Sequence, residues 1–217
     1  MNRIDKFLSN FEKQPTVENI TEENYIKLRT IGSSMTSIVY LVYYIQKEEI
    51  FALKYYIECD IESEKLSNRE IENYSHLDFP FIPKFIGTNK NKKFILFEFV
   101  NGKTLSNIEN LHFSDDDKIS IIFDLMLTIE YLHRNNFIYR DLKPNNVMID
   151  QNKTAVLIDF DRLISKESKN IKKSILFSEF AAPEVFSSYI SDKCDIYSLG
   201  KLINYITNGK RFIIPGN

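Results

Sequence analysis

The chain has 217 residues, 43% of them apolar, 27% charged and 13% aromatic, which is enough apolar material to bury one large domain or two small lobes. The formal net charge of −2 gives no indication of a nucleic-acid or acidic-membrane partner. Without an apolar run near 18 residues or a secretory signature, the sequence predicts a soluble, cytoplasmic protein. Its two cysteines, Cys59 and Cys194, lie far apart and are predicted to be reduced thiols.

The first 24 residues are predicted to form a short helix and a linker. The stretch "RIDKFLSNFEK" predicts an amphipathic helix over residues 3–13, because its apolar residues recur at helical spacing: Ile4, Phe7, Leu8 and Phe11. The polar stretch "QPTVENITEEN", residues 14–24, is typical of a linker. A folded domain is therefore expected to begin at Tyr25.

Residues 25–100 are dominated by short apolar, β-branched and aromatic runs, which are typical of strands. These runs are "YIKLRTI", "IVYLVYYI", "IFALKYYI" and "FILFEFV". One helical segment, residues 62–77, interrupts them before the breaker "DFPFIP". The pattern predicts a mostly antiparallel sheet with one helix laid across it.

Residues 101–217 have a mainly helical pattern. Ser114 and Asp117 form a capping-box-like start to a helix, whose buried stripe is expected to be Ile119, Ile122, Met126 and Ile129. Short strands and loops are expected over 137–164, and the apolar stretch "CDIYSLGKLINYIT" predicts a second helix. The fold class is therefore α+β, with a β-rich half preceding an α-rich half.

Several polar motifs follow one another in a fixed order. Lys54 stands in "FALK" on a predicted strand, and Glu70 lies in the next helix. They are followed by "YRDLKPNN", "IDFD", "APE" and "DIYSLG". An Asp with an Asn five residues later is on its own typical of a solvated turn, but the ordered set resembles the protein kinase family, in its serine/threonine form, from about Tyr25 to Phe212. The resemblance implies a two-lobed kinase domain over 25–217, with lobes at 25–100 and 101–217.

The resemblance implies a role for each charged residue of the set. Lys54 is expected to bind the α- and β-phosphates of ATP and Glu70 to pair with it, whereas Glu72 is expected to be a solvated charge on another helix face.

The remaining polar residues of the set belong to the chemistry itself. Asp141 is expected to orient or accept the proton of the attacking hydroxyl, and Lys143 to neutralise the γ-phosphate. Asn146 and Asp159 are expected to hold Mg²⁺, a cation that prefers oxygen ligands. Asp195 resembles the aspartate that braces the catalytic-loop backbone.

The same resemblance implies a site for the adenine base. Phe97 matches the position at its gate, and the backbones of Glu98 and Val100 match the hinge. The other positions that match the nucleotide-binding surface are Ile31, Gly32, Val39, Ala52 and Met148. Without the motif frame, core packing is the simpler reading of the apolar members.

The sequence departs from the family pattern in four places. In the phosphate-covering loop "GSSMTSIV", Ser34 and Ser37 replace glycines, so weaker ATP binding is expected. Asp161 replaces the glycine that usually follows "DF", at a turn where Asp tolerates the left-handed region. Tyr139 replaces a commoner His, with an expected packing role. The α lobe is expected to be shortened, which would leave apolar surface for a partner or for self-association.

Three functions are consistent with these residues. The first is ATP- and Mg²⁺-dependent phosphorylation of serine or threonine on protein substrates, with Lys54, Glu70, Asp141 and Lys143 as the catalytic set. The second is a pseudokinase-like nucleotide-binding or scaffold module, which the altered loop and Asp161 favour. The third is a kinase-like small-molecule phosphotransferase, against which "APE" and "DIYSLG" argue because those segments build the protein-substrate platform. Neither a nucleic-acid nor a membrane partner is expected.

Overall fold

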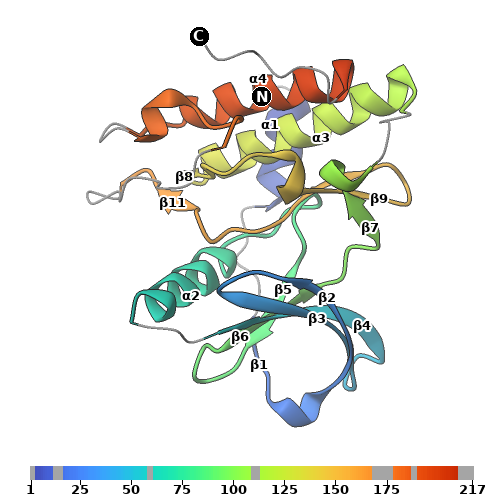
Figure 1. The fold of residues 1–217 in the computed structure, drawn as a ribbon, viewed down its shortest axis with the longest axis vertical. Coiled ribbons are helices and arrows are strands. Elements are labelled where there is room, and N and C mark those ends of the chain that lie inside the picture. The colour runs from blue at the N-terminus through green and yellow to red at the C-terminus, as the bar shows by residue number, and fades with distance from the viewer. Residues whose placement is uncertain are drawn as a thin grey trace. The chain divides into compact units, whose positions relative to one another are not determined.

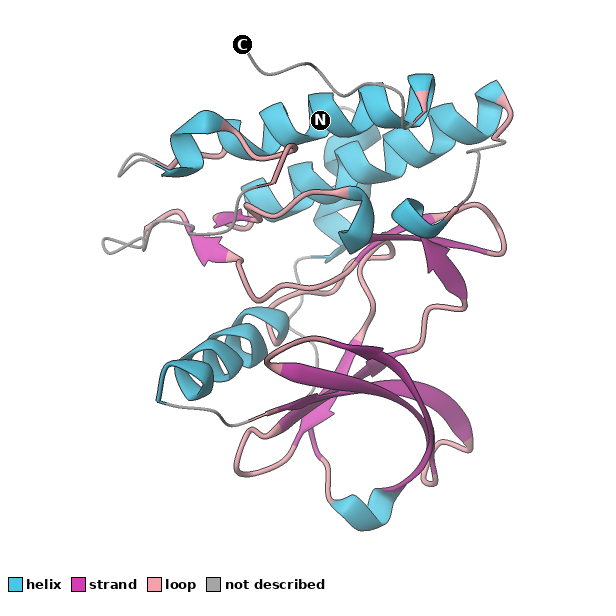
Figure 2. Ribbon diagram, viewed as in Figure 1, coloured by secondary structure: helices cyan, strands magenta, loops and turns pink. Residues whose placement is uncertain are grey.

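The computed structural model describes residues 3–11, 17–57, 61–108, 113–167, 178–186 and 190–209, with side chains described for all except 61–67 and 186. The chain forms two compact units, residues 1–100 and 101–217. Strands predominate in the first unit, whereas long helices characterise the second (Figure 1, Figure 2). Cys59 lies outside the described residues, and Cys194 is a buried free thiol whose pKa is raised by burial.

The first unit is built on a six-stranded sheet in the order β1-β5-β6-β4-β3-β2. All neighbouring pairs are antiparallel except β1 with β5. The four predicted strand runs are confirmed as the longest strands of this sheet: β2 (Tyr25–Ser33), β3 (Ser37–Tyr44), β4 (Glu49–Tyr56) and β6 (Phe94–Glu98).

Two short strands were not predicted, and one of them corrects the expected linker over residues 14–24. β1 (Glu18–Asn19) pairs in parallel with β5 (Phe85–Thr88), so residues 18–19 are part of the sheet. A Cβ at Gly87 would lie 2.1 Å from the carbonyl oxygen of Glu18, so only glycine allows the two backbones to approach this closely. A four-residue strand that contains glycine gives too weak a pattern to be predicted from sequence.

The helices of the first unit agree with the sequence patterns. α1 (Arg3–Leu8) continues as a 3₁₀ turn to Phe11, which confirms the predicted helix as far as the described residues extend. Phe7 and Phe11 meet Phe79 edge to face, with ring centroids 6.0 and 5.3 Å apart. The predicted second helix is α2 (Ile61–Tyr74).

The second unit combines two helices with two small sheets. α3 (Asp115–Arg134) begins at Ser114, which forms the predicted capping box with Asp117. β10, β9 and β7 form an antiparallel sheet in that order, and β11 pairs with β8. The bounds of the remaining elements are β7 (Gly102–Thr104), β8 (Phe137–Ile138), β9 (Val147–Asp150), β10 (Ala155–Leu157), β11 (Ile164–Ser165) and α4 (Lys193–Asn208).

The predicted buried stripe of α3 is largely wrong. Ile119 and Met126 are exposed, at 65% and 49%, and of the predicted set only Ile129 is buried. The helix instead buries a stripe that includes Ile121, Leu125, Thr128 and Leu132. Because apolar residues occur on more than one side of this helix, spacing alone did not identify the side that packs.

In the described part of the chain, no helix is long and apolar enough to cross a membrane.

Candidate active site

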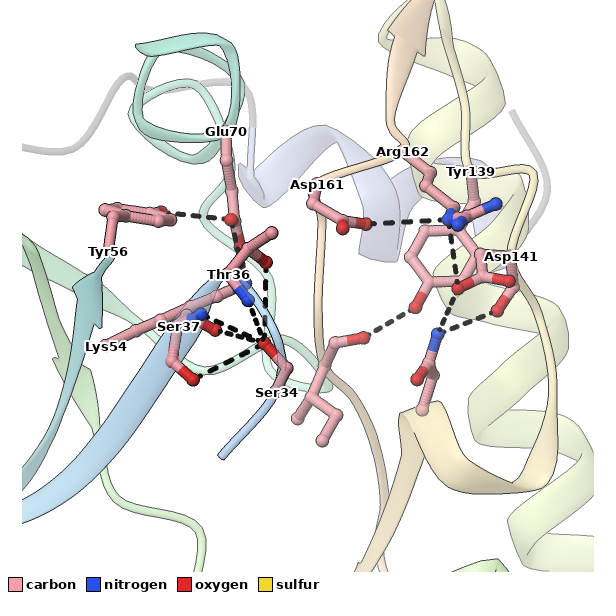
Figure 3. Close-up of polar contacts among 12 residues, drawn as sticks. Ser34, Thr36, Ser37, Lys54, Tyr56, Glu70, Tyr139, Asp141, Asp161 and Arg162 are labelled. Atoms are coloured by element: carbon pink, nitrogen blue, oxygen red, sulfur yellow. Dashed lines mark hydrogen bonds and ion pairs between the residues drawn. The ribbon is translucent and has the colours of Figure 1, made fainter. Parts of the chain in front are cut away.

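Lys54 and Glu70 form a close ion pair in the first unit. The Nζ atom of Lys54, on β4, lies 2.8 Å from both carboxylate oxygens of Glu70, on α2 (Figure 3). Glu70 is only 2% exposed, whereas Glu72 is exposed on another side of the helix, as expected. A buried carboxylate needs a cationic partner, and the bidentate contact fixes the ammonium at one position above the sheet.

Tyr56 contacts both members of this ion pair, and it was not among the predicted site residues. Its hydroxyl donates to Glu70 Oε2 at 3.0 Å, and Lys54 Nζ lies 5.7 Å from the centre of its ring (Figure 3). Because successive side chains of a strand alternate between faces, Tyr56 shares the face of Lys54 two residues earlier. The spacing of two residues between Lys54 and Tyr56 on β4 could therefore have predicted that Tyr56 lies beside Lys54.

The residues matched to the adenine site include a contiguous set on one face of the first sheet. Val39 pairs with Lys54, and Ala52 pairs with Phe97, so all four side chains share the face that meets Glu70. Gly32 pairs with Val39, and a Cβ there would lie 3.8 Å from the Val39 side chain. Glycine therefore leaves the surface above Val39 uncovered.

The other matched positions lie in less regular surroundings. Ile31 is at an irregularity in the β2–β3 pairing and is 36% exposed. Glu98 ends β6, where its backbone N–H donates to the Lys84 carbonyl at 2.9 Å, and Val100 follows beyond the strand. Met148 lies on β9 of the second unit and is half-buried.

In the second unit, Asp195 holds the loop that carries Asp141. Its fully buried carboxylate accepts the backbone N–H groups of Tyr139 and Arg140 at 2.8 and 2.7 Å, and His133 Nε2 lies 2.8 Å from it. Arg140 has a φ of 68°, a conformation that costs a non-glycine residue energy. The bracing role expected for Asp195 is confirmed, since its bonds stabilise this backbone.

Asp141 is surrounded by three polar side chains. Lys143 Nζ lies 2.7 Å from Asp141 Oδ2. The amide nitrogen of Asn146 donates to both the carbonyl oxygen and Oδ2 of Asp141, each at 2.9 Å. Arg162 Nε lies 3.6 Å from the same Oδ2 (Figure 3). These contacts fix the orientation of the Asp141 carboxylate from several directions.

Asn146 and Asp159 are brought together by the residue before Asp159. The Ile158 N–H donates to the Asn146 carbonyl at 2.9 Å, while the Ile158 carbonyl accepts from the Tyr139 hydroxyl at 2.5 Å. The buried Tyr139 ring also meets Phe160 edge to face at 5.4 Å, and burial raises its pKa well above the usual value, so the hydroxyl stays a neutral donor. Tyr139 therefore does more than pack.

The left-handed turn expected at Asp161 is instead at Asp159, which has a φ of 67°. Asp161 has no positive φ, so its replacement of glycine does not strain the backbone. Its Oδ1 lies 3.9 Å from Arg162 Nε, the same atom that faces Asp141 (Figure 3). Asp161 thus belongs to a charge cluster with Asp141 and Arg162.

The chemistry of the residues present fits a nucleoside triphosphate and a hard cation. Lys54 supplies a fixed positive charge beside the apolar surface of Val39 and Ala52. In the second unit the Asn146 amide nitrogen donates to Asp141, so the amide oxygen is the atom suited to a cation. The backbone bond from Ile158 to the Asn146 carbonyl holds the segment that carries Asp159 against Asn146. Among the described residues, no group of three or more His, Cys, Asp or Glu side chains could hold a metal ion. A cation site here would therefore include the Asn146 amide oxygen.

Comparison with known proteins identifies the family. Residues 25–215 match the protein kinase domain, so the chain belongs to the protein kinase family, as its motifs predicted. Its β-rich first unit and α-containing second unit are those of the two-lobed kinase fold.

Curated relatives carry protein kinase names, and two of the three described below are named serine/threonine-protein kinases. A probable serine/threonine-protein kinase of Dictyostelium discoideum is 29% identical over 206 residues, covering 88% of this chain and 44% of the relative. An Aurora kinase of Eremothecium gossypii is 28% identical, covering 80% and 50%. The serine/threonine-protein kinase sgk-1 of Caenorhabditis elegans is 29% identical, covering 84% and 42%. The chain spans about half the length of these relatives or less.

Proposed function

We propose that the chain binds ATP with Mg²⁺ and phosphorylates serine or threonine residues of protein substrates. The observation that carries this proposal is the bidentate 2.8 Å contact between Lys54 and Glu70. In protein kinases this ion pair must be formed for phosphoryl transfer to proceed.

The mechanism assigns separate tasks to the two units. In the first, Lys54 holds the α- and β-phosphates, Glu70 fixes Lys54, and the face with Val39 and Ala52 takes the base. In the second, Asp141 orients and accepts the proton of the attacking hydroxyl. Bound ATP and Mg²⁺ supply the phosphoryl group and the cation that neutralises its charge.

Lys143, Asn146 and Asp159 complete the part of the second unit. Lys143 neutralises the γ-phosphate, and Asn146 would hold the cation together with Asp159. The backbone bonds from Asp195 support these positions by fixing the loop that carries Asp141.

The test is incorporation of radiolabelled γ-phosphate into a generic basic protein and into the chain itself. Asp141→Asn should abolish incorporation. The matched control is Asp116→Asn, the same chemical change at an exposed position of α3, which should leave incorporation unchanged. Equal incorporation by wild type and Asp141→Asn would contradict the proposal.

A second candidate is a pseudokinase-like module that binds nucleotide with little turnover. It is favoured by the serine-containing loop, where the Ser34 hydroxyl accepts the backbone N–H groups of Thr36 and Ser37. In the family these N–H groups are expected to face the phosphates. A melting temperature raised by ATP–Mg²⁺, with no measurable incorporation, would support this second function.

A further inference from the structure

The loop between β2 and β3 closes on the hydroxyl group of Ser34. Ser34 Oγ accepts the backbone N–H groups of Thr36 at 3.2 Å and Ser37 at 3.0 Å, and lies 3.0 Å from Ser37 Oγ (Figure 3). The Ser34 N–H donates to the Ser37 carbonyl at 2.8 Å. Met35, at the tip of the loop, is 92% exposed.

The loop is also fixed to the strand that carries Lys54. The Thr36 carbonyl accepts the N–H of Ile57, the residue after β4, at 2.8 Å. Thr36 is therefore held through both its N–H, by Ser34, and its carbonyl. These hydrogen bonds together keep the N–H groups of Thr36 and Ser37 directed toward Ser34 Oγ.

An oxygen atom that accepts successive backbone N–H groups occupies the position that an anion takes in a phosphate-binding loop. In a glycine-rich loop no side chain is available to fill this position, so the donors remain for phosphate oxygens. Here Ser34 stands at one of the replaced glycines, and its hydroxyl acts as an internal ligand.

We propose that Ser34 competes with the phosphates of ATP for the N–H groups of Thr36 and Ser37, and so sets the affinity of the loop for the triphosphate. This inference rests on the proposed function. In this arrangement the serine hydroxyl competes with phosphate oxygens as an acceptor, which agrees with the weaker ATP binding expected from the sequence. Because the competition concerns phosphates, it affects ATP and leaves adenosine unaffected.

The test uses Ser34→Ala, which removes the hydroxyl without adding the backbone freedom of glycine. Ser34 has no positive φ, so alanine fits its backbone. The matched control is Ser120→Ala, the same change at an exposed position of α3. Ser34→Thr keeps a hydroxyl and should behave like wild type.

Two measurements are needed. Hydrogen exchange without nucleotide should show faster exchange of the Thr36 and Ser37 amides in Ser34→Ala only. Calorimetry should then show ATP–Mg²⁺ binding about fivefold tighter or more than wild type, since each hydrogen bond released contributes on the order of a few-fold. Adenosine affinity should not change.

The outcomes separate this inference from the function on which it rests. Unchanged exchange of both amides, or ATP affinity that stays equal or falls in Ser34→Ala, would overturn the role of Ser34. If exchange becomes faster but neither wild type nor the variants bind ATP at millimolar concentration, the proposed nucleotide function fails, and the competition fails with it.

Discussion

The hydroxyl of Tyr139 donates a 2.5 Å hydrogen bond to the carbonyl of Ile158, the residue immediately before Asp159. Asp159 itself has a φ of 67°, so its backbone is stable only where its neighbours hold it. Tyr139 thereby links the loop that carries Asp141 to the segment that carries Asp159.

Tyr139→Phe should separate these two segments while keeping the buried ring. We expect a loss of about 1–2 kcal/mol in the free energy of unfolding, since the half-buried Ile158 carbonyl loses its donor. If Asp159 holds Mg²⁺ as proposed, the Mg²⁺ concentration for half-maximal phosphate incorporation should also rise. Denaturant unfolding and Mg²⁺ titration measure the two effects.

The control for this change is Tyr197→Phe, at an exposed position of α4. It should alter neither quantity. A Tyr139→Phe protein with lower stability but an unchanged Mg²⁺ requirement would limit Tyr139 to a structural role.

Tyr56→Phe should loosen the contact between Lys54 and Glu70. The hydroxyl donates to a carboxylate, and a hydrogen bond to a charged group contributes about 1.5–3 kcal/mol. We expect the melting temperature to fall by a few degrees and phosphate incorporation to decrease in parallel. Tyr55→Phe is the control, because Tyr55 lies on the opposite face of the sheet, with Lys27 5.6 Å from its ring. Equal effects of the two changes would refute this account.

Asp161→Gly should not improve phosphate incorporation. The backbone at Asp161 has no positive φ, so glycine relieves no strain there. Removal of the carboxylate leaves the Arg162 charge to pair with Asp141, and we expect incorporation to fall about two- to fivefold, the scale of a partly exposed ion pair. A rise in incorporation would show that the family's glycine is what this loop lacks.

Asp124→Asn should stabilise the protein at neutral pH. Asp124, on α3, is 7% exposed and accepts the Ala155 N–H at 3.0 Å. Burial raises the pKa of this carboxyl, the Asp150 charge raises it further, and the bond from Ala155 opposes the shift. A folded-state pKa above the unfolded value means that stability is lost as pH rises through the folded pKa. Asparagine keeps the acceptor without the charge.

Thermal unfolding across pH tests this sign. The advantage of Asp124→Asn over wild type should be present at pH 7 and shrink as pH falls toward the ordinary Asp value of about 4. Asp124→Ala should instead be destabilised by about 1–3 kcal/mol, since the buried Ala155 N–H loses its acceptor. A greater stability of wild type than of Asp124→Asn at pH 7 would contradict the argument.

The sequence alone determined the family, the four long strands of the first sheet, the helix carrying Glu70 and the start of α3. These features depend on local signals: alternating apolar residues, a capping box, and motifs whose order is independent of packing. The same signals distinguished Glu70 from Glu72, because two residues along a helix point to different sides.

Only the tertiary structure decided which side of α3 is buried, because an apolar helix offers several sides and its neighbours choose among them. It also decided that β1 joins β5, where Gly87 permits the approach of Glu18. The tertiary structure also decided the contacts of four side chains, those of Tyr56, Tyr139, Arg162 and Ser34. Each joins atoms of particular geometry, and residue type and spacing do not specify which hydroxyl or guanidinium group will face a given carboxylate, carbonyl or amide.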